Sequence, residues 1–293
     1  MNVSSFNSLI IALWQRLCRI IPERYYLKVL YRLKMNRRLN LESPRTMNEK
    51  LQWLKLNYRN PKFTTLVDKV QVKKYISNML GSEFIIPTLG VWDHFDDIPF
   101  DALPNQFVLK TNHSGGNTGV IVCGDKSKLD LKAAKKKLEK SLRCDISFTL
   151  GEWPYRNVSR KILAEVYMGE DLVDYKFYCF NGYADVVLLC IDRCAGHPKF
   201  YFFDREWNLR RLNKMGKEAP ADFTLPKPKG MDAMFQVASK LSEGIPFVRV
   251  DLYYIDDKIY FGEMTFFPAS GFDKNRLPEA DMYFGSKIVL PEI

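Results

Sequence analysis

Histidine is scarce in this chain. Its 293 residues include only His94, His113 and His197, and no two of them form an H-x-x-x-H pair. A zinc enzyme is therefore not expected. The six cysteines form no C-x-x-C pair either. Because a chain of this size buries enough apolar surface to fold without cross-links, we expect reduced, mostly buried thiols in a cytosolic protein.

Long apolar runs are missing as well. The stretch from Leu9 to Trp14 is apolar, but Arg16 and Arg19 interrupt the region well short of the roughly 18 apolar residues that a membrane span requires. It has no basic segment before the apolar stretch and no small-residue cleavage site, so a signal peptide is not expected.

The same N-terminal region has the pattern of an amphipathic helix. Trp14, Leu17 and Ile21 recur at helical spacing, with basic residues that include Arg24 and Lys28 nearby. Such a helix either docks against the rest of the protein or contacts an anionic membrane surface. A cytoplasmic location is expected, and contact with the inner face of the membrane stays open.

Basic charge is abundant. The chain carries 44 Lys and Arg against 34 Asp and Glu, a net charge of +10 with a pI near 9.2. This excess suits nucleic acid, nucleotide phosphates, an acidic polysaccharide or a membrane face. No long Lys/Arg tract, zinc-finger spacing or RNA-binding motif is present, so nucleic acid is not expected. The 46% of apolar residues excludes a mainly disordered chain.

The pattern along the chain favours an α+β fold. Strands and helices mix without a regular βαβ alternation. Helices are expected at Asn48 to Leu56, about Thr64 to Met79, Leu129 to Leu142 and Met231 to Leu241. Strands are expected at 107–110, 120–123, 162–167, 174–180, 184–192, 199–203, 247–254 and 259–265.

The last two expected strands carry an acidic pair. Alternate side chains of a strand share a face, so Arg249 lies beside Asp251, while Phe261 and Thr265 lie on the face of Glu263. A three-residue loop at 256–258 places Asp251 directly across from Glu263. A two-residue loop at 256–257 places them on opposite faces.

Two adjacent carboxylates repel each other and require a cation between them. Mg²⁺ takes one or two protein carboxylates together with phosphate oxygens and water, and a neighbouring arginine neutralises a transferring phosphoryl group. The alternative is a solvated hairpin edge with a surface Arg–Asp contact. The apolar residues around Asp251 and Glu263 favour a core position, where unpaired charges are costly.

Two other segments have the composition of a nucleotide site. The strand that ends at Lys110 leads into Ser114-Gly115-Gly116, where backbone N–H groups can close over phosphates. This is no Walker A loop, and a plain hairpin turn is the alternative. The apolar segment 162–169 precedes Asp171, Asp174 and Lys176. It suits an adenine-binding hinge, although by itself the segment is better explained as an ordinary buried strand that ends in an acidic turn.

Taken in order, these pieces resemble the ATP-grasp superfamily, specifically its TupA-like branch, which is associated with bacterial teichuronopeptide, capsule and O-antigen synthesis. The resemblance covers about residues 42 to 290. The motifs that carry it are Met47-Asn48-Glu49-Lys50-Leu51-Gln52-Trp53, Asp68-Lys69, Phe107-Val108-Leu109-Lys110-Thr111-Asn112, Ile162-Leu163-Ala164-Glu165, Asp174-Tyr175-Lys176-Phe177 and Gly262-Glu263-Met264-Thr265-Phe266.

The resemblance implies two α+β lobes that clamp ATP, preceded by a helical extension. It places the helical region at 1–60, the first lobe with a glycine-rich flap at 61–164, and the second lobe with the metal site at 165–293. The implied cofactors are ATP and two Mg²⁺ ions.

The resemblance also implies a role for each candidate residue. The ATP-binding set comprises Lys69, Lys110, Ser114, Gly115, Gly116, Asn117, Glu165, Val166, Tyr167, Asp174 and Lys176. Arg249, Lys110 and Lys176 are the implied catalytic residues, and the implied metal ligands are Asp251, Glu263 and Thr265. In the superfamily an Asn usually stands two residues after the glutamate, so Thr265 departs from the pattern and leaves the third ligand open.

The implied chemistry is ADP-forming carboxylate–amine ligation through an acyl phosphate. For the TupA-like branch the implied substrates are a uronic acid of a surface polysaccharide and an amino acid. The alternatives are a glycosyltransferase, although no clear D-x-D motif occurs, a sugar hydroxyl kinase, or a nucleotide-binding protein without catalysis. Residues 267–272 are expected to face the acceptor, and Arg193 and Arg276 are candidates for binding its carboxylate.

Overall fold

The computed structural model describes residues 20–115, 118–170, 172–192 and 196–292. The helices are α2 (Glu23–Met35), α3 (Met47–Asn57), α4 (Lys62–Val67), α5 (Gln71–Leu80), α6 (Leu131–Leu142), α7 (Ile146–Thr149), α8 (Lys214–Glu218), α9 (Met231–Leu241) and α10 (Pro278–Lys287). The strands are β1 (Thr88–Trp92), β2 (Phe107–Thr111), β3 (Val120–Cys123), β4 (Ile162–Val166), β5 (Asp174–Phe180), β6 (Tyr183–Ile191), β7 (Lys199–Phe203), β8 (Leu209–Arg210), β9 (Val248–Ile255) and β10 (Lys258–Thr265).

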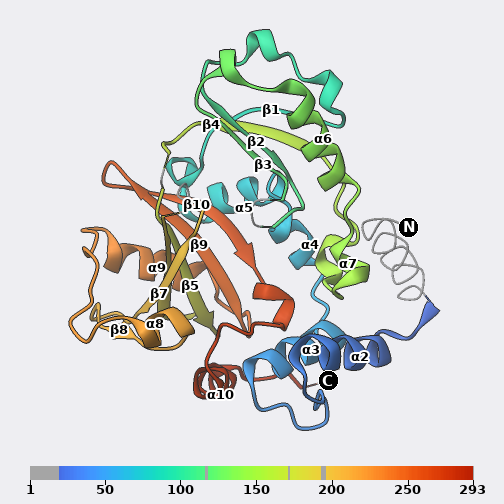
Figure 1. Cartoon of the computed structure of the whole chain (residues 1–293), viewed down its shortest axis with the longest axis vertical. Coiled ribbons are helices and arrows are strands. Elements are labelled where there is room, and N and C mark those ends of the chain that lie inside the picture. Colours follow the sequence, from blue (N-terminus) through green and yellow to red (C-terminus); the bar gives the residue numbers. More distant parts are fainter. Residues whose placement is uncertain (1–19, 116–117, 171, 193–195, 293) are drawn as a thin grey trace.

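Two antiparallel sheets organise the chain. The smaller has the strand order β1-β4-β2-β3 and the larger β10-β9-β5-β6-β7-β8. Figure 1 shows the smaller sheet above the larger one, with α6 beside it. This arrangement confirms the expected α+β fold. Strand β1 was not expected from the sequence, and the predicted lobe boundary at 164/165 falls inside β4.

The larger sheet is covered on both faces. Phe177 of β5 packs edge-on against Phe235 of α9, with ring centres 4.9 Å apart. Tyr178, the next residue, stacks on Phe284 of α10 from the other side, at 5.2 Å. This alternation follows from the period of two in a strand. Helix α10 covers one end of its face, and the other end points toward the smaller sheet.

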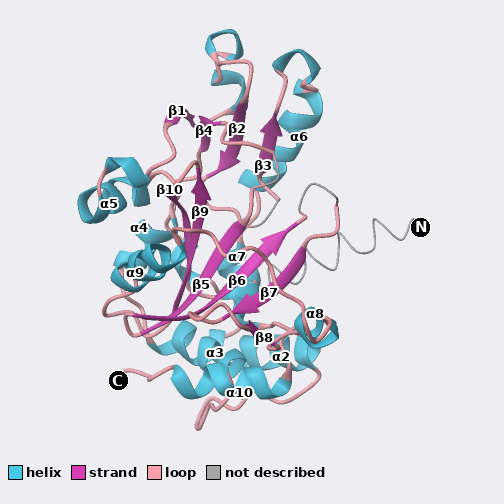
Figure 2. Cartoon of the chain, turned by 90° about the vertical axis from the view of Figure 1, so that its left-hand side faces the viewer, coloured by secondary structure: helices cyan, strands magenta, loops and turns pink. Residues whose placement is uncertain are grey.

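The N-terminal helices belong to the same core. Helix α3 begins with a capping box between Thr46 and Glu49, and its Leu51 and Leu54 are buried in the cluster that contains the larger sheet. Figure 2 shows α2, α3 and α10 together at the end of the molecule away from the smaller sheet. The N-terminal helices therefore support the larger sheet directly.

The helix expected from about Thr64 to Met79 is wrong as one element, because the chain breaks between α4 and α5. At the break the buried Asp68 carboxylate accepts hydrogen bonds from the backbone N–H of Val70 and from the Asn112 side chain, at 2.9 and 3.0 Å. A side chain that bonds nearby backbone competes with continued helix. The break places Lys69 outside both helices and beside the loop after β2.

The β9–β10 hairpin combines two irregularities. Asp256 and Asp257 both have positive φ and form a two-residue loop, since Ile255 pairs with Lys258. A bulge at Gly262 then shifts the register, so that Asp251 still lies across from Glu263. Of the two loops considered from the sequence, the two-residue loop is present, yet the bulge gives the pairing that was expected only with the three-residue loop.

The bulge also corrects the face assigned to one residue. Phe261 pairs with Leu252 and is buried, so it lies on the opposite face from Glu263 and Thr265. Thr265 pairs with Arg249 and stays on the face of the acidic pair.

Gly285 of α10 is expected to tolerate no side chain. A Cβ there would lie 2.1 Å from the Arg45 carbonyl oxygen and 2.8 Å from the Met47 nitrogen, both backbone atoms at the start of α3. We expect Gly285→Ala to lower the free energy of unfolding by about 1–3 kcal/mol through overpacking. Denaturant unfolding measures the change. The control Met282→Ala, on an exposed part of α10, should stay within about 0.5 kcal/mol of wild type.

Candidate active site

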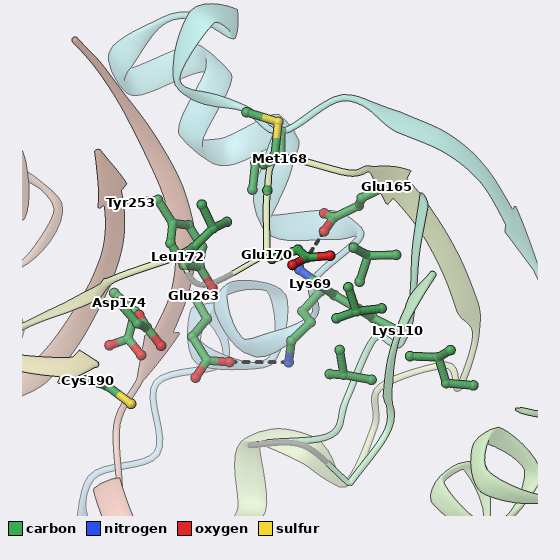
Figure 3. Close-up of a pocket in the computed structure, with 18 of the residues that line it drawn as sticks. Lys69, Lys110, Glu165, Met168, Glu170, Leu172, Asp174, Cys190, Tyr253 and Glu263 are labelled. Atoms are coloured by element: carbon green, nitrogen blue, oxygen red, sulfur yellow. Dashed lines mark ion pairs between the residues drawn. The ribbon is translucent and has the colours of Figure 1, made fainter. Parts of the chain in front are cut away.

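A cavity of about 860 Å³ is lined by residues of both sheets and the segments between them. From the smaller sheet come Lys110 and Glu165, and from the larger come Asp174, Lys176 and the β9–β10 hairpin. Figure 3 shows the charged side chains that converge on this space. We call it the first cavity. Its volume lies within the range of roughly 300–1,000 Å³ that small-molecule sites occupy.

The carboxylates of Asp251 and Glu263 lie at one end of the first cavity. Arg249 forms a double hydrogen bond with Asp251, its Nε and Nη2 each 2.6 Å from a carboxylate oxygen. The same Nη2 is 3.2 Å from Glu263 Oε1 and 3.0 Å from the Thr265 hydroxyl. One guanidinium thus contacts all three residues that were predicted as metal ligands.

Two lysines complete the pairing of these carboxylates. Lys176 lies directly opposite Asp251 in the sheet, and its Nζ is 2.5 Å from Asp251 Oδ2 and also bonds Asp174. Lys69 Nζ lies 3.3 Å from Glu263 Oε2, as the dashed line in Figure 3 shows. The site residues of the larger sheet therefore form one network of alternating charge.

The protonation states follow from this network. Burial alone would raise the pKa of Glu263, but Lys69 and Arg249 outweigh it and lower the pKa to about 2. Burial alone would lower the pKa of Lys176, but the carboxylates of Asp174 and Asp251 outweigh it and raise the pKa above its ordinary value. The pKa of Glu263 in the folded protein lies below its ordinary value of 4.5. The charged carboxylate therefore stabilises the folded state fully above about pH 4.5, and this stabilisation is lost as the pH falls toward 2.

Glu165 holds two lysines of the first lobe. Its carboxylate is buried and lies 2.6 Å from Lys110 Nζ and 2.5 Å from Lys73 Nζ. Burial would raise the pKa of Glu165, but Lys110 and Lys73 outweigh it and lower the pKa. Lys73 was not predicted as a site residue. The one sign of its role in the sequence was its position four residues after Lys69, which places both side chains on the same side of the single helix that was expected there.

Only part of the predicted adenine-binding hinge, residues 165–167, lines the first cavity. Val166 and Met168 line the first cavity with Glu165, whereas Tyr167 is not among the lining residues. The Val166 N–H is already bonded to the Pro87 carbonyl at 3.1 Å. Met168 and Leu172, which the sequence analysis did not single out, add apolar surface at this end (Figure 3).

A second cavity of about 280 Å³ lies beside Glu263 of the acidic pair. It shares Arg249 and Glu263 with the first cavity and adds Thr265 and the loop after β10. Ser114 and Gly115 of the predicted flap line this second cavity and are absent from the lining of the first. Gly116 and Asn117 of the flap lie outside the described residues, as do Asp171, Arg193, Trp14 and Leu17.

The donor set of the acidic pair fits magnesium. Within the described parts of the chain no group of three or more His, Cys, Asp and Glu gathers as a complete metal site. Asp251 and Glu263 supply two carboxylates and Thr265 a hydroxyl on one face of the hairpin. Mg²⁺ is bound in this way, by one or two carboxylates whose remaining partners are phosphate oxygens and water.

Arg276, one of the two candidates for binding an acceptor carboxylate, is not available for that role. Its side chain is 1% exposed and pairs with Asp273 and Asp281, each at 3.2 Å. It therefore joins the start of α10 to the preceding loop, and it lines neither cavity.

Comparison with known proteins identifies the family of the chain. The family model described as TupA-like ATP-grasp matches residues 49–289, and the chain belongs to that family. The match confirms the ATP-grasp fold and the class of enzyme, an ATP-grasp ligase. ATP-grasp enzymes use ATP with magnesium. No curated protein sequence matches the chain.

Solved structures with some similarity include a D-alanine–D-alanine ligase from Helicobacter pylori, with a TM-score of 0.47, 13% identity and coverage of 83% of this chain and 69% of that one. The corresponding ligase from Bacillus anthracis has a TM-score of 0.42 and 18% identity, and the match covers 76% of this chain and 63% of that one. An L-amino acid ligase from Bacillus licheniformis has a TM-score of 0.46 and 14% identity, with coverage of 76% of this chain and 49% of that one. The chain spans less than two thirds of the last two.

Glu165→Gln tests the support of the lysines in the first lobe. The variant leaves Lys73 and Lys110 without their shared carboxylate, and removing one partner of a buried ion pair costs about 3 kcal/mol. We expect a lower melting temperature and a higher KM for ATP, because Lys110 loses the group that orients it. Glu83→Gln, an exposed carboxylate after α5, is the control. Unchanged stability and KM in Glu165→Gln would contradict the role.

Proposed function

We propose that this chain is an ATP- and Mg²⁺-dependent ligase that activates a uronic acid of a capsular or O-antigen polysaccharide, or of its precursor, as an acyl phosphate and joins it to an amino acid. The observation that carries the proposal is the position of the acidic pair. Glu263 of this pair and Arg249 line both cavities, and Asp251 lines the first, so phosphates in the first cavity can react beside them with a group that enters from the second.

In this proposal ATP fills the first cavity. Adenine lies at the apolar end near Val166 and Met168, and Asp174 takes the ribose hydroxyls. The triphosphate extends toward Lys69 and Lys110, whose Nζ groups are now paired with Glu263 and Glu165. Phosphate oxygens are stronger partners for a lysine than a shared carboxylate, because they carry more charge.

Two Mg²⁺ ions, held by Asp251, Glu263 and phosphate oxygens with Thr265 as a further donor, would neutralise charge on the phosphates. In the structure Arg249 and Lys176 occupy the oxygens of Asp251. With nucleotide and metal bound, Asp251 and Glu263 would serve as metal ligands, and Arg249 and Lys176 would be free to pair with the phosphates. Each buried charge keeps a counter-charge throughout, which avoids the cost of leaving one unpaired.

Arg249 then faces the group that is transferred. A carboxylate oxygen of the acceptor attacks the γ-phosphorus, the bond to the β-phosphate oxygen breaks, and ADP leaves. An amine attacks the carbonyl carbon of the acyl phosphate, the C–O bond breaks, and phosphate leaves. A guanidinium at the shared wall of the two cavities stabilises negative charge in both steps.

The acceptor is proposed from charge and family together. A net charge of +10 suits a polyanionic saccharide, and the chain belongs to the TupA-like family, for which the resemblance in the sequence implied a uronic acid acceptor. A sugar kinase or a glycosyltransferase of the same kind of biosynthesis is the second candidate.

A product analysis separates these candidates. The protein is incubated with ATP, Mg²⁺, an amino acid pool and a uronic acid presented as polymer, lipid-linked unit or nucleotide sugar. ADP release that depends on both carboxylate and amino acid supports ligation. ADP release with a phosphorylated sugar and no need for amino acid indicates a kinase. Turnover that requires a nucleotide sugar and no ATP indicates a glycosyltransferase and overturns the proposal.

Asp251→Asn and Glu263→Gln should each reduce ADP release at least ~100-fold, since each removes a charged ligand that stabilises the transition state. The thermal unfolding of both variants should remain cooperative. Asp256→Asn, an exposed carboxylate in the loop of the same hairpin, should keep wild-type turnover. Near-normal ADP release by both site variants would show that the metal site lies elsewhere.

We also propose peripheral contact with an anionic membrane surface through α2. Tyr25, Val29 and Leu33 recur every four residues and are 62%, 50% and 68% exposed. Basic Arg24 and Arg32 flank them on the exposed part of the helix. An exposed apolar stripe beside basic residues is the composition of an interfacial helix. No helix among the described residues is long and apolar enough to cross a membrane.

The triple variant Tyr25→Ser/Val29→Ser/Leu33→Ser should bind vesicles of anionic phosphatidylglycerol at least ~10-fold more weakly than wild type, because it removes most of the buried apolar area. Cosedimentation measures the binding. Val122→Ser, which is equally exposed but lies on the smaller sheet, should bind as wild type does. Equal binding by the triple variant would exclude α2 as the contact.

A further inference from the structure

The second cavity contains a carboxylate that the proposed ATP and metal sites do not use. Glu152 is 6% exposed and lines this cavity, together with Arg249 and Glu263. It lies in the segment between α7 and β4, far in sequence from the acidic hairpin. At about 280 Å³ the cavity is close to the lower end of the ~300–1,000 Å³ range for ligand sites, which suits a small molecule better than a polymer.

Among the described residues, the Glu152 carboxylate accepts one side-chain hydrogen bond, from the Ser270 hydroxyl to Oε1. Burial raises the pKa of Glu152, and the positive charge of the buried Lys55 lowers it in part. The Lys55 Nζ, however, donates to the carbonyl oxygens of Leu150 and Ser270, at 2.7 and 2.8 Å, and to the Gln52 side chain, at 3.1 Å. A buried carboxylate that no described cation contacts directly is only partly compensated, so the cavity beside it suits a positively charged ligand.

Hydrogen bonds from α3 fix the loop that forms the cavity wall beside Glu152. Ala269 and Ser270 both have left-handed backbone, with φ of 49° and 54°, which is strained for residues other than glycine. Gln52 and Lys55 of α3 fix this loop by donating to the Ser270 carbonyl oxygen, at 3.0 and 2.8 Å. This arrangement turns the Ser270 hydroxyl toward Glu152.

The other carboxylates at the junction are already engaged. Glu263 pairs with Lys69 and Arg249, and Asp251 pairs with Arg249 and Lys176. Burial raises the pKa of Glu152, whereas Lys55 and Ser270 oppose the rise. A carboxylate whose pKa is raised is a better proton acceptor near neutral pH than an ordinary one.

We propose that Glu152 is the catalytic residue that binds the ammonium group of the incoming amino acid and accepts its proton as the nitrogen attacks the acyl phosphate. This inference rests on the ligase function proposed above. The ammonium first transfers one proton to Glu152. The nitrogen lone pair then forms the C–N bond, the C–O bond to the phosphate breaks, and the nitrogen loses its second proton to the departing phosphate.

Hydroxylamine separates this step from activation. It is largely neutral at pH 7, so it captures an acyl phosphate as a hydroxamate without a proton acceptor. We use ATP, Mg²⁺, a mixture of uronic acids, and either hydroxylamine or an amino acid pool. In Glu152→Gln we expect amino acid ligation to fall at least ~100-fold, the scale of general base catalysis. Hydroxamate formation should stay within threefold of wild type.

Two further variants control for structure. Glu152→Asp keeps the carboxylate and should restore part of the amino acid ligation. Ser270→Ala removes only the hydrogen bond and should raise the KM for the amino acid more than it lowers kcat. Melting curves with and without ATP and Mg²⁺ check that each variant folds and binds nucleotide.

The outcomes are distinct. Wild type that forms neither hydroxamate nor ligated product refutes the proposed ligase, and Glu152 loses its assignment with it. Wild type that ligates, with Glu152→Gln ligating as well, overturns the role of Glu152 alone. Equal loss of hydroxamate and of amide in Glu152→Gln also overturns it, because the residue would then act on activation or on the fold.

Discussion

The site depends on one constraint: two carboxylates on one face of a hairpin must be neutralised in a buried position. Arg249 contacts Asp251, Glu263 and Thr265 at once, and Lys176 and Lys69 bring in a neighbouring strand and the other lobe. Because buried charges are stable only when paired, this network fixes how β5, β9 and β10 must be arranged. It also fixes where the first lobe must approach.

The same reasoning explains the position of the two cavities. Each is bordered by groups whose present partners are protein side chains of opposite charge, and Arg249 and Glu263 belong to both walls. A nucleotide with its metal can replace such partners without leaving a charge alone. Glu152 differs, since the side chain that hydrogen-bonds to it among the described residues is the neutral Ser270 hydroxyl. We therefore expect an amine to bind beside Glu152 and the phosphates to bind in the first cavity.

Local chemistry in the sequence predicted much of this arrangement. Alternation along a strand placed Arg249 beside Asp251, and the order of Lys69, Lys110 and the acidic hairpin pointed to the family that the comparison confirms. The α+β class followed from the mixture of strand and helix patterns. The first of these inferences rests on neighbours within a few residues, where backbone geometry dictates which side chains share a face, and the second on the order of short motifs along the chain.

Only the tertiary structure decided which distant groups meet. The bulge at Gly262 restored a pairing that the two-residue loop would have broken, and a glycine inside a strand is compatible with a bend or a close backbone approach as well as with a bulge. Lys73 forms an ion pair with Glu165, 92 residues away in the sequence. Ser270 donates a hydrogen bond to Glu152, 118 residues away. The sequence determined the kinds of charge available, whereas the packing of sheets and helices determined how each charge is paired, because burial makes the pairing obligatory.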